Sequence, residues 1–129
     1  MPIFLLDEKP VFPSAELADK DGIIAVGGDL SPERLLNAYS RGIFPWFSQE
    51  DPLIWWSPDP RLVLLPGELH VSKSMQKLLN KNPFALTSDR EFEQVIEHCS
   101  LPREKQKETW ITREMVDAYI NLHRLGYAH

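Results

Sequence analysis

The sequence predicts an α+β fold, in which a small N-terminal α/β unit is followed by a second unit of alternating helices and strands. Four segments carry apolar residues at helical spacing, and several short apolar runs bounded by Gly or Pro have the length of strands. The 129 residues are enough for one compact domain, or for one domain and part of another. The composition, 43% hydrophobic and 26% charged, is that of an ordinary globular protein.

The first unit is expected to contain a short strand and a helix. Residues 22–26 form the first strong apolar run, which predicts a buried strand followed by a turn. A helix is predicted over residues 32–41, because Ser31 can cap it and Pro32 suits its first position. Gly42 suits the position after the helix, where φ is positive. The side chains expected to face inward are Leu35, Leu36, Ala38 and Tyr39.

The segment that follows, residues 43–61, is expected to be irregular and rich in aromatic side chains. Four prolines within it block a helix. Successive side chains of an extended chain point to opposite sides, so either Trp55 or Trp56 should be the more exposed of the two. We place a domain boundary here, with an aromatic-rich domain over residues 1–60 and a second domain over residues 61–129.

The second unit is expected to begin with a buried strand over residues 61–65, and a further short strand is predicted over residues 84–87. A helix is predicted over residues 72–81. Ser88 and Glu91 have the spacing of a capping box for another helix. The apolar side of that helix is predicted to consist of Phe92, Val95, Ile96 and Cys99.

The last predicted helix begins at Thr112 as its N-cap and is closed by Gly126. Its inward side chains are expected to be Met115, Val116, Tyr119 and Leu122. Because a chain rarely ends so soon after such a glycine, we expect the sequence to be cut short.

Conventional catalytic and metal-binding patterns are missing from the sequence. No Cys/His cluster has metal-ligand spacing, and we expect neither a metal nor a cofactor. Cys99 falls on an apolar helix side and is expected to be inert core, whereas His98 should face solvent. Asp59 and Arg61 are expected to form a local ion pair. With a single cysteine and no apolar run long enough to span a membrane, a cytoplasmic protein is expected.

The aromatic and proline-rich loop is the first candidate binding surface. Exposed indoles on a loop stiffened by proline offer flat faces for a base or for a peptide. For any single tryptophan, such as Trp46, a place in the core is the commoner outcome. The residues alone leave both interpretations open.

The second candidate surface is the helix over residues 72–81. Lys73, Lys77 and Lys81 recur every four positions, and no acidic residue occurs from residue 70 to residue 84, although the chain has a net charge of −5. The opposite side of the helix is apolar and is expected to pack against the rest of the fold. The lysines are either an ordinary solvated face or a contact for phosphate groups, and the absence of acidic partners favours phosphate.

Five motifs, in this order and with this spacing, resemble the bacterial leucyl/phenylalanyl-tRNA–protein transferase family. The resemblance covers nearly the whole chain, and the second and third motifs together are highly specific. The motifs are Gly-Gly-Asp-Leu-Ser (residues 27–31), Ala-Tyr-Ser-Arg-Gly-Ile-Phe-Pro-Trp-Phe (38–47), Trp-Trp-Ser-Pro-Asp-Pro-Arg (55–61), Thr-Trp-Ile-Thr (109–112) and Leu-His-Arg-Leu-Gly (122–126).

The resemblance implies an aminoacyltransferase, which moves Leu or Phe from Leu-tRNA or Phe-tRNA to proteins that begin with Arg or Lys. The product is a substrate for protein degradation by the N-end rule. No ATP, metal or cofactor is implied, because the tRNA ester is already activated. The fold implied for residues 61–129 is the first part of an acetyltransferase-like (GNAT) domain.

The resemblance also implies roles for individual residues. Trp46 and Trp110 match the family's tryptophans that hold the 3′-terminal adenosine of the tRNA. Tyr39 and Tyr119 match tyrosines near that site. Lys73, Lys77 and Lys81 fall where the family places basic residues against the tRNA backbone.

No catalytic residue is assigned within this chain. The family's side-chain pocket and proposed catalytic groups lie beyond residue 129, so we expect little or no transferase activity from the chain alone. Two alternatives are a non-catalytic module that binds the tRNA end, and a module whose Trp/Pro loop grips an extended peptide.

Overall fold

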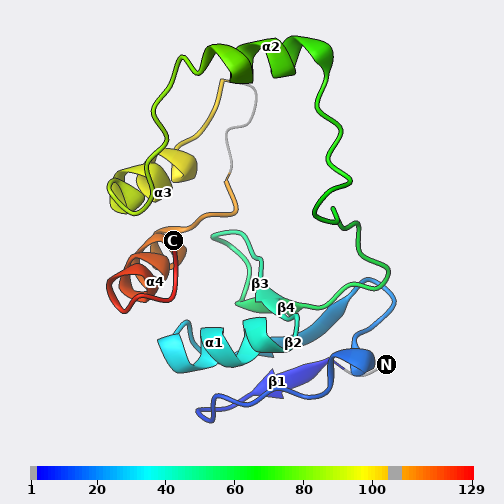
Figure 1. Ribbon diagram of the computed structural model, residues 1–129. Coiled ribbons are helices and arrows are strands. Elements are labelled where there is room, and N and C mark those ends of the chain that lie inside the picture. Colours follow the sequence, from blue (N-terminus) through cyan, green and yellow to red (C-terminus); the bar gives the residue numbers. More distant parts are fainter. Residues whose placement is uncertain (1–2, 105–108) are drawn as a thin grey trace.

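The computed structural model describes residues 3–104 and 109–129 as a mixed α and β fold (Figure 1). No helix within these ranges is both long and apolar enough to cross a membrane. The strands are β1 (Phe4–Leu6), β2 (Ile23–Gly27), β3 (Phe44–Pro45) and β4 (Ile54–Trp56). The helices are the short 3-10 helix η1 (Ala15–Leu17), α1 (Pro32–Ser40), α2 (Lys73–Lys81), α3 (Phe92–Ser100) and α4 (Arg113–Arg124).

The four strands form one sheet in the order β1-β2-β4-β3. β1 pairs with β2 in parallel, whereas β4 lies antiparallel to both β2 and β3. The register places Ala25 of β2 opposite Trp55, and Trp55 opposite Pro45 of β3. The sheet therefore fixes the start of the loop that follows Pro45.

Helices α1 and α4 pack with the sheet around one apolar core (Figure 1). Leu122 of α4 is buried in the same cluster as residues of β2, α1 and β4, so the last helix belongs to this packed body. The division of the chain at residue 60 stays a prediction. The buried members of the cluster are Phe12, Ile24, Ala25, Leu35, Ala38, Ile43, Trp55 and Leu122.

Helix α3 lies at the edge of the packed body, against α4. The ring of Phe92 stacks on His123 with centroids 4.2 Å apart. An ion pair between Arg124 and Glu93, with 2.8 Å between Nη2 and Oε1, joins the same two helices. These contacts attach α3 to α4 along one side only, and none of the residues of α3 is buried.

A long segment lies largely outside the packed body, and we call residues 59–91 the exposed arm. It meets the rest of the chain near its two ends, where Arg61 bonds to Gly42 and Asp89 pairs with His129. Every residue in it is exposed except Val71, which is half-buried. Figure 1 shows α2 at the end of the molecule opposite the sheet, joined to it by extended chain. The predicted packing of the apolar side of α2 is therefore wrong, because Met75, Leu78 and Leu79 are all exposed.

Three predicted helices are confirmed. The caps at Ser31 and Thr112 were expected, and Ser72 caps α2 as well. Ser31 accepts a hydrogen bond from the Arg34 amide at 3.4 Å, and Ser72 and Thr112 accept from the third residue of their helices at 3.3 Å. The helices begin where sequence patterns placed them because the cap is a local interaction. Gly42 follows α1 with φ +72°, as expected.

The predicted strands over residues 61–65 and 84–87 are wrong. Both segments lack strand structure and are exposed, and Leu62 is fully accessible. A strand satisfies its backbone groups only by pairing with a neighbour. No described strand pairs with either segment, so the apolar sequence alone does not produce a strand.

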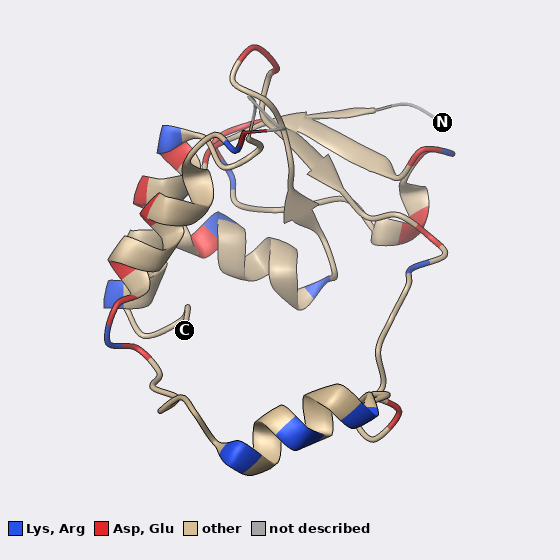
Figure 2. Cartoon of the chain, turned by 90° about the horizontal axis from the view of Figure 1, so that it is seen from above, with Lys and Arg blue, Asp and Glu red and all other residues tan. Residues whose placement is uncertain are grey.

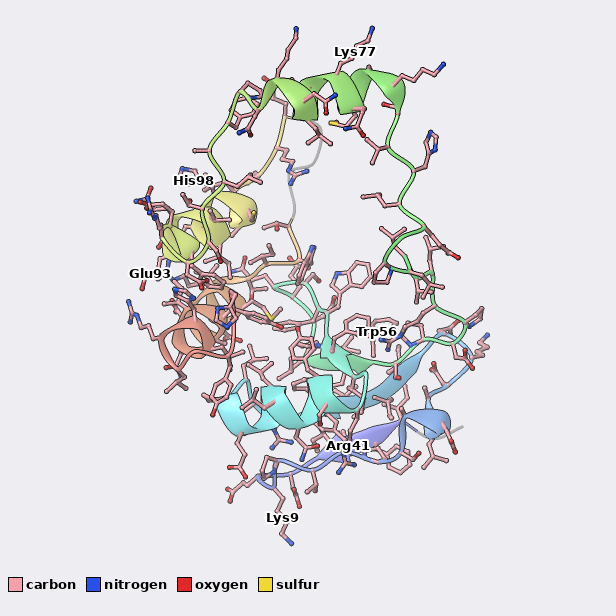
Figure 3. All side chains as sticks on the ribbon, in the orientation of Figure 1. Lys9, Arg41, Trp56, Lys77, Glu93 and His98 are labelled. Atoms are coloured by element: carbon pink, nitrogen blue, oxygen red, sulfur yellow. The ribbon has the colours of Figure 1, made fainter. Side chains whose placement is uncertain are left out.

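Several side-chain predictions also need correction. Ser88 and Glu91 form no capping box, since α3 begins at Phe92 with no side-chain cap. Cys99 is exposed and not core, because α3 is covered on one edge only. Leu36 and Tyr39 are exposed, while Leu35 and Ala38 are buried, so the inward face of α1 is narrower than expected. His98 is exposed, as predicted (Figure 3).

Candidate functional site

Trp46 lies on a loop that the sheet holds at both of its ends. Its backbone amide donates to the carbonyl of Ile54 at 3.0 Å, and its carbonyl accepts from the indole Nε1 of Trp56 at 2.6 Å. Because the main chain is fixed from two sides, the Trp46 side chain projects from a rigid support. The side chain itself is 53% exposed. Trp46 is therefore not a core residue, although a core position is the commoner outcome for a tryptophan.

Trp110 reaches the same place from the other end of the chain. It lies two residues before the Thr112 cap of α4, and its carbonyl accepts from the Thr112 amide at 3.2 Å. Its ring meets that of Trp46 with centroids 6.4 Å apart and planes at 65°. Trp110 is 47% exposed. The structure thus brings together the two tryptophans that we call the tryptophan corner.

The angle between the two rings limits how a planar ligand could bind. Rings at 65° in edge contact form a corner, and no parallel slot lies between them. A flat ring would therefore stack on the free face of one indole and touch the edge of the other. The sequence did not predict that the two rings would meet at an angle instead of lying parallel with a slot between them.

A cavity of about 540 Å³ opens beside the tryptophan corner, and we call it the aromatic groove. This volume is in the range of small-ligand sites. Arg61 is the one charged side chain among the described residues that line it. The lining residues are Tyr39, Gly42, Ile43, Phe44, Pro45, Trp46, Arg61 and Trp110.

A smaller cavity of about 360 Å³ lies on the other side of the tryptophan corner. It shares Trp46 and Trp110 with the aromatic groove but contains the Asp51 carboxylate. Asp51 accepts a hydrogen bond from the hydroxyl of Ser48. This side of the corner is thus acidic, whereas the aromatic groove is not.

Tyr39 and Tyr119 meet through their hydroxyl groups, which share a hydrogen bond. Their rings lie edge to face, with centroids 6.4 Å apart. Although the Tyr39 side chain is partly exposed, desolvation around the paired hydroxyls raises the pKa of both phenols above the usual range, and the shared hydrogen bond raises the pKa of Tyr119 further. Both hydroxyls therefore stay protonated at neutral pH. Tyr39 lines the aromatic groove, and Tyr119 supports it from α4.

The adjacent tryptophans of β4 differ as the strand geometry predicts. Trp55 is fully buried, donates from Nε1 to the Gly27 carbonyl at 2.9 Å, and packs edge to face on Phe12. Trp56 is only half-buried and lies behind Trp46, with centroids 6.3 Å apart (Figure 3). Trp55 is a core residue, and Trp56 supports the tryptophan corner.

Lys73, Lys77 and Lys81 do not lie in the aromatic groove. All three are exposed along α2, where no acidic residue interrupts them (Figure 2). Figure 3 shows Lys77 pointing outward, away from the sheet. We call these residues the lysine stripe, and it forms a second surface separate from the tryptophan corner.

Arg61 is the groove residue that sequence reasoning missed. The predicted ion pair with Asp59 is absent from the described structure, and the guanidinium instead donates to the carbonyls of Pro58 and Gly42. It also lies over the Phe44 ring, 5.3 Å from the centroid. Nothing in the local sequence reveals a contact with Gly42 and Phe44, because these residues lie on another segment.

The comparisons with known proteins agree on one family. The family description "Leucyl/phenylalanyl-tRNA protein transferase" matches residues 63–129, and the description of its N-terminal domain matches residues 28–59. A protein of Anaeromyxobacter sp. strain K named leucyl/phenylalanyl-tRNA–protein transferase is 58% identical over all of this chain and 56% of its own length.

Proteins of the same name from Desulforapulum autotrophicum and Shewanella baltica strain OS155 are each 55% identical. The alignments span 100% and 98% of this chain, and 57% and 54% of the two relatives. The chain thus spans a little over half the length of these relatives. It belongs to the leucyl/phenylalanyl-tRNA protein transferase family.

Proposed function

We propose that this chain forms the part of an aminoacyltransferase that binds the aminoacylated end of a tRNA. The full reaction transfers Leu or Phe from aminoacyl-tRNA to the α-amine of a protein that begins with Arg or Lys. The modified protein then enters N-end-rule degradation in the cytoplasm. Family membership supports the reaction class, and the aromatic groove supports the binding step.

The chemistry is attack of an amine on an ester, in which a C–N bond forms and the C–O bond to the tRNA ribose breaks. The amine loses a proton, and the ribose oxygen gains one. Since the ester is already activated, an enzyme contributes positioning, proton transfer and stabilisation of the oxyanion. We assign this chain the positioning of the tRNA end and none of the catalytic groups.

The tryptophan corner is the observation that carries the proposal. Its two indoles come from distant segments, are about half exposed, and meet at the mouth of an aromatic cavity. Stacking on an aromatic side chain stabilises a bound base by about 1–3 kcal/mol, regardless of sequence. We propose that the terminal adenine stacks here, with Tyr39 on the groove wall and Tyr119 behind it.

The lysine stripe is proposed to contact the backbone of the tRNA body. Three exposed ammonium groups with no acidic neighbour on α2 would position an RNA without reading its sequence. Lysine binds phosphate as a point charge, and its affinity depends strongly on salt. We further propose that residues 61–129 belong to an acetyltransferase-like domain.

Binding of an aminoacyl-adenosine mimic of the puromycin type tests the proposed function. We expect Trp46→Ala and Trp110→Ala each to weaken binding roughly 5- to 150-fold, the equivalent of one lost stacking contact. Tyr127→Ala, which removes an exposed aromatic outside the groove, is the matched control and should bind normally.

Unchanged affinity in both tryptophan variants would contradict the proposal. So would a chain that binds extended peptides and whose binding is indifferent to both the nucleoside mimic and the salt concentration. That result would favour a peptide-interaction module.

A further inference from the structure

The aromatic groove holds one charge whose role the proposed function does not explain. Its described lining is otherwise aromatic, aliphatic or glycine, and Arg61 contributes the guanidinium. The Arg61 side chain is exposed, so each of its donors meets either a protein group or solvent. The surroundings of Arg61 show which of its donors have a protein partner.

The guanidinium is held in place by the backbone. Nε donates to the Pro58 carbonyl at 3.2 Å, and Nη2 donates to the Gly42 carbonyl and to the Ser57 hydroxyl. The plane also lies over the Phe44 ring. Because two sides of the group are fixed, little conformational entropy remains to be lost when it binds a ligand.

The remaining donor, Nη1, has no hydrogen-bond or ion-pair partner in the described part of the chain. It lies beside Gly42, since a Cβ built on that glycine would meet Nη1 at 3.7 Å. Gly42 lines the same groove. The fixed cation therefore presents a free N–H edge, with its full charge, at the groove wall.

Its surroundings indicate which kind of anion this edge would bind. Four aromatic side chains share the groove (Tyr39, Phe44, Trp46 and Trp110), which favours a ligand with a planar ring. Arginine suits phosphate in shape and charge. The cavity on the other side of the tryptophan corner contains Asp51, which would repel the same anion.

We propose that Arg61 binds a phosphate group of the nucleic acid whose terminal base stacks on the tryptophan corner. This inference rests on the proposed function and adds a phosphate subsite within the aromatic groove, distinct from the lysine stripe. One base contact and one phosphate contact on a rigid support fix the position of a terminal nucleotide in the groove.

The test compares puromycin with puromycin 5′-phosphate on the 129-residue chain, with affinities measured by titration. We expect the phosphate to improve affinity about 10- to 150-fold in the wild type, as for a charge-assisted hydrogen bond. Arg61→Gln should remove this preference, which is measured as the ratio of the variant's own affinities for the two ligands. The Nε2 of glutamine occupies about the position of the arginine Nε, so it can still donate to the Pro58 carbonyl.

Lys9→Gln is the control for loss of one surface charge, because Lys9 is exposed on the far side of the sheet from the groove (Figure 3). It should keep the full phosphate preference. Raising the salt concentration should reduce the preference in the wild type and leave binding of puromycin unchanged.

Equal affinity of the wild type for the two ligands would overturn the phosphate subsite, whether or not the variant folds. A preference that survives in folded Arg61→Gln would overturn it too. If the chain binds neither ligand, both the proposed function and the phosphate subsite are overturned. Equal affinity for the two ligands, in contrast, overturns the phosphate subsite alone.

Discussion

The packed body and the exposed arm contain similar apolar sequences but differ in structure. In the body, Ile24, Leu35 and Trp55 are fully buried between the sheet and the helices. In the arm, residues 59–91, the run of apolar residues from 62 to 65 is exposed. Apolar sequence is thus necessary for a core but not sufficient, because a core also needs a second surface to pack against.

Within the exposed arm, helix and strand patterns behave differently. The α2 helix forms there because a helix satisfies its own backbone hydrogen bonds and Ser72 caps its first turn. The predicted strands over residues 61–65 and 84–87 do not form, because a strand depends on a partner elsewhere in the chain. The exposed arm thus shows that a helix can form from local interactions alone, whereas a strand requires a partner from another part of the chain.

The largest expected effect comes from matched leucine truncations in the two regions. Leu35→Ala, at a fully buried position, should lower the free energy of unfolding by about 2–5 kcal/mol. Leu64→Ala, where the side chain is 65% exposed, should change it by less than about 0.5 kcal/mol. Urea denaturation followed by circular dichroism measures both. Equal losses would show that the arm packs as well as the body.

The lysine stripe gives the next largest effect, and it concerns binding. Replacing Lys73, Lys77 and Lys81 by alanine should weaken binding of aminoacyl-tRNA on the order of 10- to 100-fold near 0.1 M salt. The slope of log affinity against log salt should fall by roughly 2–3, because three phosphate contacts are lost.

The aminoacyl-adenosine mimic should bind this triple variant normally, because the stripe lies outside the aromatic groove. Lys77→Ala should lower the slope by roughly 1, and its matched control Lys9→Ala by nothing measurable. If the slope of log affinity against log salt is unchanged in the triple variant, the lysines do not contact phosphate and are an ordinary solvated face of α2.

The smallest expected effect compares two helix caps with the same geometry. Thr112→Ala removes the cap of α4 in the packed body and should cost about 0.5–2 kcal/mol of global stability. Ser72→Ala removes the cap of α2 and should fray that helix without lowering global stability, since α2 has no buried residue. Hydrogen exchange distinguishes local fraying from global destabilisation. A loss of global stability in Ser72→Ala would contradict the distinction between the packed body and the exposed arm.

Local sequence signals predicted much of the fold. Serine or threonine caps placed the starts of α1 and α4, and the apolar run at residues 22–26 identified β2. Strand alternation predicted that Trp55 and Trp56 would differ in exposure. In each case the signal that was used, a cap residue or a pattern of apolar residues, lies within a few positions along the chain.

Long-range geometry could not be predicted from the residues alone. The contact of Trp46 with Trp110 joins a β3 loop to the start of α4, and only the family resemblance pointed to it. The 65° angle between the rings and the contact of Arg61 with the Gly42 carbonyl depend on the packing of distant segments. The prediction that Cys99 is a core residue was wrong for a similar reason. The apolar pattern of α3 does not reveal that this helix lies at the edge of the packed body.

The central claim is that the tryptophan corner binds the terminal adenosine, and the indole N–H signals in a proton–nitrogen NMR spectrum test it directly. The chain has four tryptophans, so each signal reports on one site. On titration with the aminoacyl-adenosine mimic, we predict large shifts for Trp46 and Trp110 and none for the buried Trp55. Signals of Trp46 and Trp110 that stay fixed at saturating mimic would contradict the account.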